Sequence, residues 1–131
     1  MRILDTDVCV ELLRGSERVI ARRLATDDQV ATTWITASEL FFGAAKSQDP
    51  DGNATLVTEL LASLPVLSLD LAAARLFGEV KAHLRARGIP LADADLFIAA
   101  TALARTATLV TGNRRHYERI PGVAIEDWIR G

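Results

Sequence analysis

Short apolar runs alternate with stretches of helical periodicity along the chain. Residues 2–4 form an apolar run that ends in the polar segment 5–7, and Val8, Leu12 and Leu13 then recur with helical spacing. This pattern predicts a strand, a turn and a helix in that order. The same reasoning predicts further strands at 29–35, 108–111 and 123–126, and a short strand or connection at 65–68.

Capping residues and apolar stripes predict helices between these strands. The expected ranges are 16–25, 37–47 after an opening Thr36, 54–64, 71–87 after a capping Asp70, 96–104 and 114–119. A polar cluster at 49–53 is interpreted as the turn that ends the helix 37–47. Because strands alternate with helices, we expect an α/β fold with a mostly parallel sheet sandwiched between helices.

The composition fits one globular domain over residues 1–131. Half of the 131 residues are apolar, which is enough for a single continuous core. No apolar run reaches the roughly 18 residues that cross a bilayer, and no export signal is recognised, so we expect a soluble, cytoplasmic protein without membrane contact. The single cysteine, Cys9, stands among apolar residues and is expected to pack in the core.

The formal net charge of −2 is unusual for a protein that binds nucleic acid. The total hides the distribution, because all but two of the 15 basic residues are arginines, and Arg114, Arg115 and Arg119 fall in one short segment. These arginines either contact phosphate or belong to solvated helix faces, and composition does not separate the two interpretations.

Acidic residues fall where strands are expected to end and helices to begin. Asp5 follows the first strand, Glu39 lies in the first turn after the second, and Asp93 and Asp95 open the helix before the strand 108–111. Ligand sites of open parallel sheets form at this edge. Crowded carboxylates call for a hard divalent cation, and the absence of a His/Cys pattern disfavours zinc, so Mg²⁺ or Mn²⁺ is expected, with phosphodiester hydrolysis as the chemistry.

Helix capping is the alternative explanation for the same acids. Residues 36–39, Thr-Ala-Ser-Glu, form a capping box, Asp7 is able to cap the first helix, and Asp93 the later one. Asp5 and Asp95 are harder to explain in this way. Asp5 ends an apolar strand, and Asp95 lies beyond the expected cap.

Four ordered segments resemble the PIN-domain family, and specifically its VapC-type toxins. They are Ile-Leu-Asp-Thr-Asp at 3–7, Thr-Ala-Ser-Glu-Leu at 36–40, Pro-Leu-Ala-Asp-Ala-Asp-Leu-Phe-Ile-Ala-Ala-Thr-Ala at 90–102, and Leu-Val-Thr-Gly-Asn-Arg-Arg-His-Tyr at 109–117. The resemblance spans nearly the whole chain. It implies a three-layer α/β/α fold, metal-dependent endoribonuclease activity on RNA, a homodimer, and a cognate antitoxin that inhibits the enzyme.

The resemblance also implies roles for individual residues. Asp5, Glu39 and Asp95 would be the catalytic, metal-binding carboxylates, with Asp93 as an additional ligand or supporting group. Polar and basic residues would bind the substrate, namely Thr6, Asn113, Arg114 and Arg115. Many relatives carry a further acid near the last segment, where this chain has Asn113 and His116. The missing acid puts the binding of a second metal in question, but not that of the first. His116 itself is interpreted either as a substrate contact or as an exposed surface residue.

Two other functions remain open at this stage. The segment 4–8 resembles the Asp-x-Asp opening of haloacid-dehalogenase-like phosphatases, but the only lysines, Lys46 and Lys81, fall inside expected helices and no acidic pair follows the strand 108–111. A non-catalytic PIN-like interaction module is the second alternative. Phe41 and Phe42 are adjacent in a helix, so at least one should be exposed for a partner. Metal binding separates this module from the enzyme.

Overall fold

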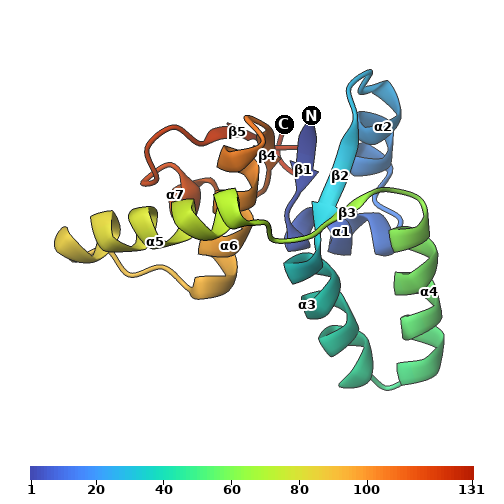
Figure 1. The fold of residues 1–131 in the computed structure, drawn as a ribbon. Helices are drawn as coiled ribbons and strands as arrows, with labels where there is room; N and C mark the ends of the chain where they lie inside the picture. Colours follow the sequence, from blue (N-terminus) through green and yellow to red (C-terminus); the bar gives the residue numbers. More distant parts are fainter.

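The computed structural model describes residues 1–131 and contains one sheet of five parallel strands. These strands are β1 (Arg2–Leu4), β2 (Val30–Thr33), β3 (Val66–Leu67), β4 (Thr108–Val110) and β5 (Ala124–Glu126). Their order across the sheet is β3-β2-β1-β4-β5, so the chain builds one edge outward from β1 and then returns to build the other (Figure 1). The strand order therefore reverses beside β1, which is where open α/β sheets bind ligands.

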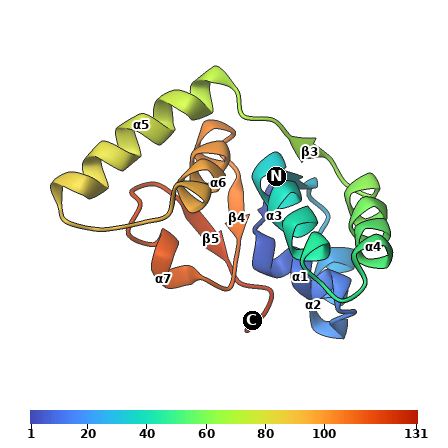
Figure 2. The same ribbon diagram turned by 90° about the horizontal axis from the view of Figure 1, so that it is seen from below.

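Seven helices cover the two faces of the sheet. They are α1 (Thr6–Leu13), α2 (Glu17–Ala25), α3 (Trp34–Ala45), α4 (Pro50–Ala62), α5 (Leu71–Ala86), α6 (Asp93–Ala104) and α7 (Arg114–Tyr117). Figure 2 shows α1 to α4 on one side of the sheet and α5 to α7 on the other. The expected three-layer α/β/α sandwich is thus confirmed. None of the helices has the length and apolar character needed to cross a bilayer.

Successive apolar side chains of the central strands point to opposite faces of the sheet, so the core is divided into two clusters. Ile3 and Leu109 pack into the cluster under α5 and α6, whereas their neighbours Leu4 and Val110 pack into the cluster under α1 to α4. All four side chains are fully buried. Successive strand residues point to opposite faces, so two short apolar runs anchor both helical layers. Cys9 is fully buried in the second cluster, as predicted.

The helices α3 and α4 begin earlier than predicted because other side chains provide the cap. The hydroxyl of Thr33 accepts a hydrogen bond from Thr36 N at 3.2 Å, so α3 begins at Trp34 and the capping box at 36–39 does not form. Asp49 accepts from Gly52 N at 3.1 Å, and Pro50 occupies the first position of α4. The polar cluster at 49–53 is therefore the beginning of a helix rather than only a turn, as Pro at the first helical position favours.

Asp7 and Asp93, both predicted as caps, do not have that role. Asp5 caps α1 by accepting from Thr6 N at 2.8 Å, which leaves Asp7 inside the first turn. At α6 the cap position is Ala92, without a side-chain bond, and Asp93 is the first helical residue. The predicted cap of α5 is correct, because Asp70 accepts from Ala73 N at 2.9 Å.

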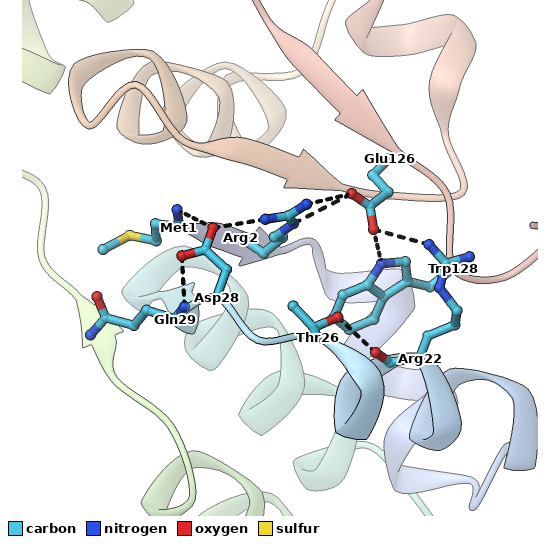
Figure 3. A network of polar contacts seen from close by, with 8 residues as sticks. All are labelled: Met1, Arg2, Arg22, Thr26, Asp28, Gln29, Glu126 and Trp128. Atoms are coloured by element: carbon cyan, nitrogen blue, oxygen red, sulfur yellow. Dashed lines mark hydrogen bonds and ion pairs between the residues drawn. The ribbon is translucent and has the colours of Figure 1, made fainter.

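A network of ion pairs ties β5 to the beginning of β1 and to α2 (Figure 3). Glu126 accepts hydrogen bonds from the indole Nε1 of Trp128 at 2.6 Å and from Arg22 at 3.0 Å, and it pairs with Arg2 at 3.3 Å. Arg2 also donates to Asp28 at 2.7 Å, just before β2. One half-buried carboxylate thus connects three separate parts of the chain.

We expect Glu126→Gln to lower the free energy of unfolding by about 1–2 kcal/mol at pH 7, since charge-assisted hydrogen bonds are lost. Burial opposes the charge of Glu126, but donation by Trp128 and the charges of Arg2 and Arg22 outweigh it and hold the pKa below its usual value. The stabilisation is therefore present at neutral pH and is lost as the pH falls through the lowered pKa. Urea denaturation at pH 7 and pH 3 should show the gap between the two proteins closing in acid.

The matched control is Glu79→Gln on α5, which breaks only an exposed pair with Arg75. Its effect should stay within about 0.5 kcal/mol. Equal losses in the two variants at pH 7 would contradict a special role for Glu126.

Candidate functional site

The carboxyl group of Asp5 is buried at the end of the central strand. Only 3% of the residue is exposed. Its Oδ1 accepts from Thr6 N at 2.8 Å, and its Oδ2 accepts from the hydroxyl of Thr111 at 2.8 Å. Thr111 directly follows β4, the neighbour of β1 in the sheet. The side chain is thereby fixed at the point where the strand order reverses.

Asp95 reaches the same place from the first turn of α6. The hydroxyl of Tyr117, on α7, donates to Asp95 Oδ1 at 3.2 Å. Negative charge on both Asp5 and Asp95 acts on this hydroxyl, and burial together with these charges raises the pKa of Tyr117 far above its usual value. Two of the predicted carboxylates therefore approach one buried phenol.

Crowding of negative charge is the main electrostatic feature of this edge. Burial, with smaller contributions from the charges of Asp7 and Asp95, raises the pKa of Asp5 to about 6, despite the lowering effect of the hydrogen bonds from Thr111 and Thr6. Burial also raises the pKa of Asp7. An ionised Asp5 is therefore costly in the absence of a positive partner.

Glu39 is held near the start of α1 rather than on Asp5 itself. Thr6 Oγ1 donates to Glu39 Oε1 at 2.6 Å and lies 3.1 Å from the hydroxyl of Thr36. Glu39 is exposed, whereas Thr36 is fully buried. Thr6 thus joins two predicted site residues, because its backbone N–H binds Asp5 and its hydroxyl binds Glu39.

Asp93 points to another partner, since its Oδ1 accepts from Lys81 Nζ on α5 at 3.0 Å. No group of three or more His, Cys, Asp or Glu side chains is arranged to hold one metal ion. The four acids proposed from the sequence consequently divide into the pair Asp5 and Asp95, Glu39 beside Thr6, and Asp93 on Lys81.

The predicted substrate-binding residues of the carboxy-terminal segment line one polar pocket. No apolar residue contributes to its wall, which consists of Gly112, Asn113, Arg114, Arg115, His116, Glu118, Asp127 and Arg130. The backbone N–H of Asn113 donates to the hydroxyl of Thr111, the same group that binds Asp5. The pocket is therefore connected to the buried carboxylate through a single threonine.

His116 lies between this pocket and Asp95. Its Nδ1 is 3.6 Å from Asp95 Oδ2, and its side chain is 56% exposed. That separation is longer than a hydrogen bond. The histidine borders the carboxylate pair without fixing it.

Sequence reasoning overlooked two hydroxyl groups, those of Thr111 and Tyr117, and the function of Asp7. Thr111 follows an apolar strand as Asp5 does, so its position could have indicated a site residue. No local sequence pattern indicates a contact between Tyr117 and Asp95. Asp7 Oδ2 accepts from Gly112 N at 2.8 Å, while Oδ1 is buried without a partner. A Cβ at Gly112 would lie 2.9 Å from Asp7 Oδ2, so any other residue there would have to displace the Asp7 carboxylate.

The donor set fits a hard divalent cation. Asp5 and Asp95 supply carboxylate oxygens, and the raised pKa of the buried Asp5 indicates negative charge that lacks compensation. Mg²⁺ commonly binds through one or two carboxylates and retains several waters, so two protein carboxylates suffice. Asp5 and Asp95 are the residues that would hold such an ion.

Comparison with known proteins gives consistent results. The sequence profile described as PIN domain matches residues 2–122. The chain is 36% identical over 127 residues to a tRNA(fMet)-specific endonuclease VapC of Salmonella typhimurium, covering 96% of both chains. It is 30% identical over 129 residues to ribonuclease VapC2 of Rickettsia felis, again covering 96% of both chains.

Solved structures agree with the sequence relatives. A DNA-bound VapBC complex from Salmonella typhimurium contains a chain with a TM-score of 0.92 and 36% identity, with 97% of each chain covered. A VapBC2 complex from Rickettsia felis, bound to a DNA fragment from its promoter, contains one with a TM-score of 0.90 and 28% identity, with 97% of this chain and 98% of that chain covered.

We expect Asp5→Asn to stabilise the metal-free protein at pH 7.5 but not at pH 4. Burial raises the pKa of Asp5 in the folded state to about 6, above the usual aspartate value of about 3.9. The protonated form is thus favoured by folding, and its stabilisation is lost as the pH rises through 6, a cost of about 3 kcal/mol that the uncharged amide avoids. Thermal melts in EDTA at the two pH values measure the difference in stability between Asp5→Asn and the wild type. Equal destabilisation of the variant at both would contradict charge crowding.

Proposed function

This chain belongs to the PIN-domain family and to its VapC ribonucleases, and from that premise we propose that it is a metal-dependent endoribonuclease, the toxin of a toxin–antitoxin module. The observation that carries the proposal is the approach of Asp5 and Asp95 to one buried hydroxyl at the strand-order reversal. The cap that Asp5 provides for α1 and its bond from Thr111 reduce the cost of burying crowded carboxylates without removing it, and a cation site explains the cost that remains.

Each polar residue has a proposed part in RNA hydrolysis. Asp5 and Asp95 hold Mg²⁺ or Mn²⁺, which when bound polarises the phosphodiester and makes water a better nucleophile. Glu39, oriented by Thr6, completes the cation site or orients the attacking water. Asp93 stays outside this proposed set because its carboxylate binds Lys81.

The polar pocket at the carboxy-terminal segment is the proposed contact for the RNA backbone. Arg114 and Arg115 offer guanidinium groups to phosphate, and Asn113 lies beside them as an amide donor. The pocket adjoins the carboxylates through Thr111. This arrangement would place a phosphodiester next to Asp5 while neighbouring phosphates contact the arginines.

An apolar groove beside Glu39 is the proposed site of the antitoxin. It lies between α1, α3 and α4, with Val10, Leu40 and Leu56 on its walls and Glu39 at its rim. The structurally similar chains occur in VapBC toxin–antitoxin complexes. An amphipathic helix of the antitoxin would fit such a groove and cover the access to Glu39.

Exposed apolar side chains around the edge strand β3 support a homodimer. Trp34 begins α3, Val66 belongs to β3, and Leu71 begins α5; they are 40%, 39% and 86% exposed. Phe42 is also exposed, at 66%, but lies farther along α3 beside Lys46. We propose that the surface of Trp34, Val66 and Leu71 binds a second copy of the chain.

We expect the purified protein to cut RNA with Mg²⁺ or Mn²⁺ and not with EDTA. Initiator tRNA is the first substrate to test, because of the name of the 36% identical relative. Asp5→Asn should reduce cleavage by at least about 100-fold, since a cation ligand is lost. Glu79→Gln, on an exposed part of α5, is the control and should cut normally. If no RNA of a structured panel is cut and calorimetry detects no Mn²⁺ binding, the chain is an interaction module.

Two substitutions of leucine by glutamate, one in each proposed partner surface, test whether the antitoxin and the second copy of the chain bind at separate places. Leu56→Glu should prevent co-purification with the cognate antitoxin while leaving the dimer intact in sedimentation experiments. Leu71→Glu should do the opposite, because each places a charge in one apolar surface only. Loss of both associations in either variant, with an unchanged melting temperature, would contradict the separation of the two surfaces.

A further inference from the structure

Tyr117 is the only tyrosine of the chain, and it brings a polar group into the core. The residue is fully buried, and its ring packs in the cluster that contains Leu96, Ile98 and Ile120. Its hydroxyl leaves this apolar surrounding and donates to Asp95 Oδ1 at 3.2 Å, close enough to Asp5 for that carboxylate to act on it as well. A phenylalanine would fill the same space, so packing does not explain the hydroxyl.

The two carboxylates of the proposed cation site are supported unequally. Asp5 accepts two hydrogen bonds, one from Thr6 N and one from Thr111, which fix both of its oxygens. The carboxylate of Asp95 accepts one, from Tyr117. The orientation of Asp95 thus depends on a single donor.

We propose that Tyr117 is a positioning residue that orients Asp95 for a divalent cation, by binding Oδ1 and leaving Oδ2 free to become the ligand. The proposal rests on the proposed nuclease function. It concerns a residue that touches neither the substrate nor the cation. Groups behind a metal ligand commonly change metal affinity by about 10- to 100-fold when removed.

A phenol suits this position better than a charged donor. A lysine or arginine here would neutralise Asp95 and compete with the cation for its negative charge. The phenol is neutral and donates one hydrogen bond to Asp95. It therefore orients the carboxylate while leaving the charge for the metal.

His116 is the only other side chain that pairs with Asp95, and it does not replace Tyr117. Its Nδ1 is 3.6 Å from Asp95 Oδ2, on the oxygen that Tyr117 does not bind, and its ring is mostly exposed. An imidazole in that position approaches the atom proposed as the ligand instead of fixing the opposite one. The orientation of Asp95 without Tyr117 would consequently be free to vary.

The test is Mn²⁺ binding to Tyr117→Phe, measured by isothermal titration calorimetry at pH 7.5. We expect Kd for Mn²⁺ to rise at least about tenfold. The KM for RNA should stay unchanged while kcat falls, since the arginine pocket is not altered. The matched control is Thr32→Val, which removes a fully buried hydroxyl that donates to Leu4 O at 2.8 Å, away from Asp95. The control should lose stability comparably but bind Mn²⁺ like the wild type.

Replacement of Tyr117 by p-aminophenylalanine restores a neutral N–H donor in the same place and should recover Mn²⁺ affinity to within about threefold, because that donor also orients the carboxylate. A Kd in Tyr117→Phe equal to that of the wild type, or an equal rise in Thr32→Val, would overturn the positioning role. A wild type that binds no Mn²⁺ at all would instead overturn the proposed function. Circular dichroism melts accompany each variant so that loss of binding is compared among folded proteins.

Discussion

The cost of burying the Asp5 carboxyl at the end of the central strand governs the structure around it. A carboxylate in this position must receive hydrogen bonds, and it obtains them from the first turn of α1 and from Thr111 after β4. These donors reduce the cost without removing it, because Asp7 and Asp95 add further negative charge. The start of α1, the register of β1 with β4 and the approach of α6 are thus all arranged about one side chain.

The acids that stabilise the fold and the acids of the proposed site belong to two separate groups. At the network around Glu126, every carboxylate has cationic partners, and the pKa values of Glu126 and Asp28 are lowered. Around Asp5, the carboxylates of Asp5 and Asp95 face hydroxyl groups and each other, and the pKa of Asp5 is raised. The first arrangement stabilises the folded chain, whereas the second opposes folding until a cation binds. This difference identifies which acids serve the fold.

Much of the fold followed from local patterns, and much of the site did not. Apolar runs with polar ends located four strands and the place of Asp5, because period-two alternation and strand ends are visible in sequence. Helix starts at Trp34 and Pro50 were misplaced, since several neighbouring residues could each cap. The bond from Tyr117 to Asp95 joins residues 22 positions apart, and that from Thr111 to Asp5 joins residues 106 apart. The hydrophobic periodicity of a sequence does not indicate contacts between residues so far apart.

The pairing of β1 with β4 also has a consequence for how the chain acquires its structure during synthesis. The neighbour of β1, strand β4, and the hydroxyl of Thr111 are synthesised more than 100 residues after β1. Contacts of such large sequence separation form late and slowly. Until β4 and Thr111 have been synthesised, a nascent chain therefore carries an open sheet edge at β1 and lacks the hydroxyl that binds Asp5, so the carboxylate cluster is assembled only after that point.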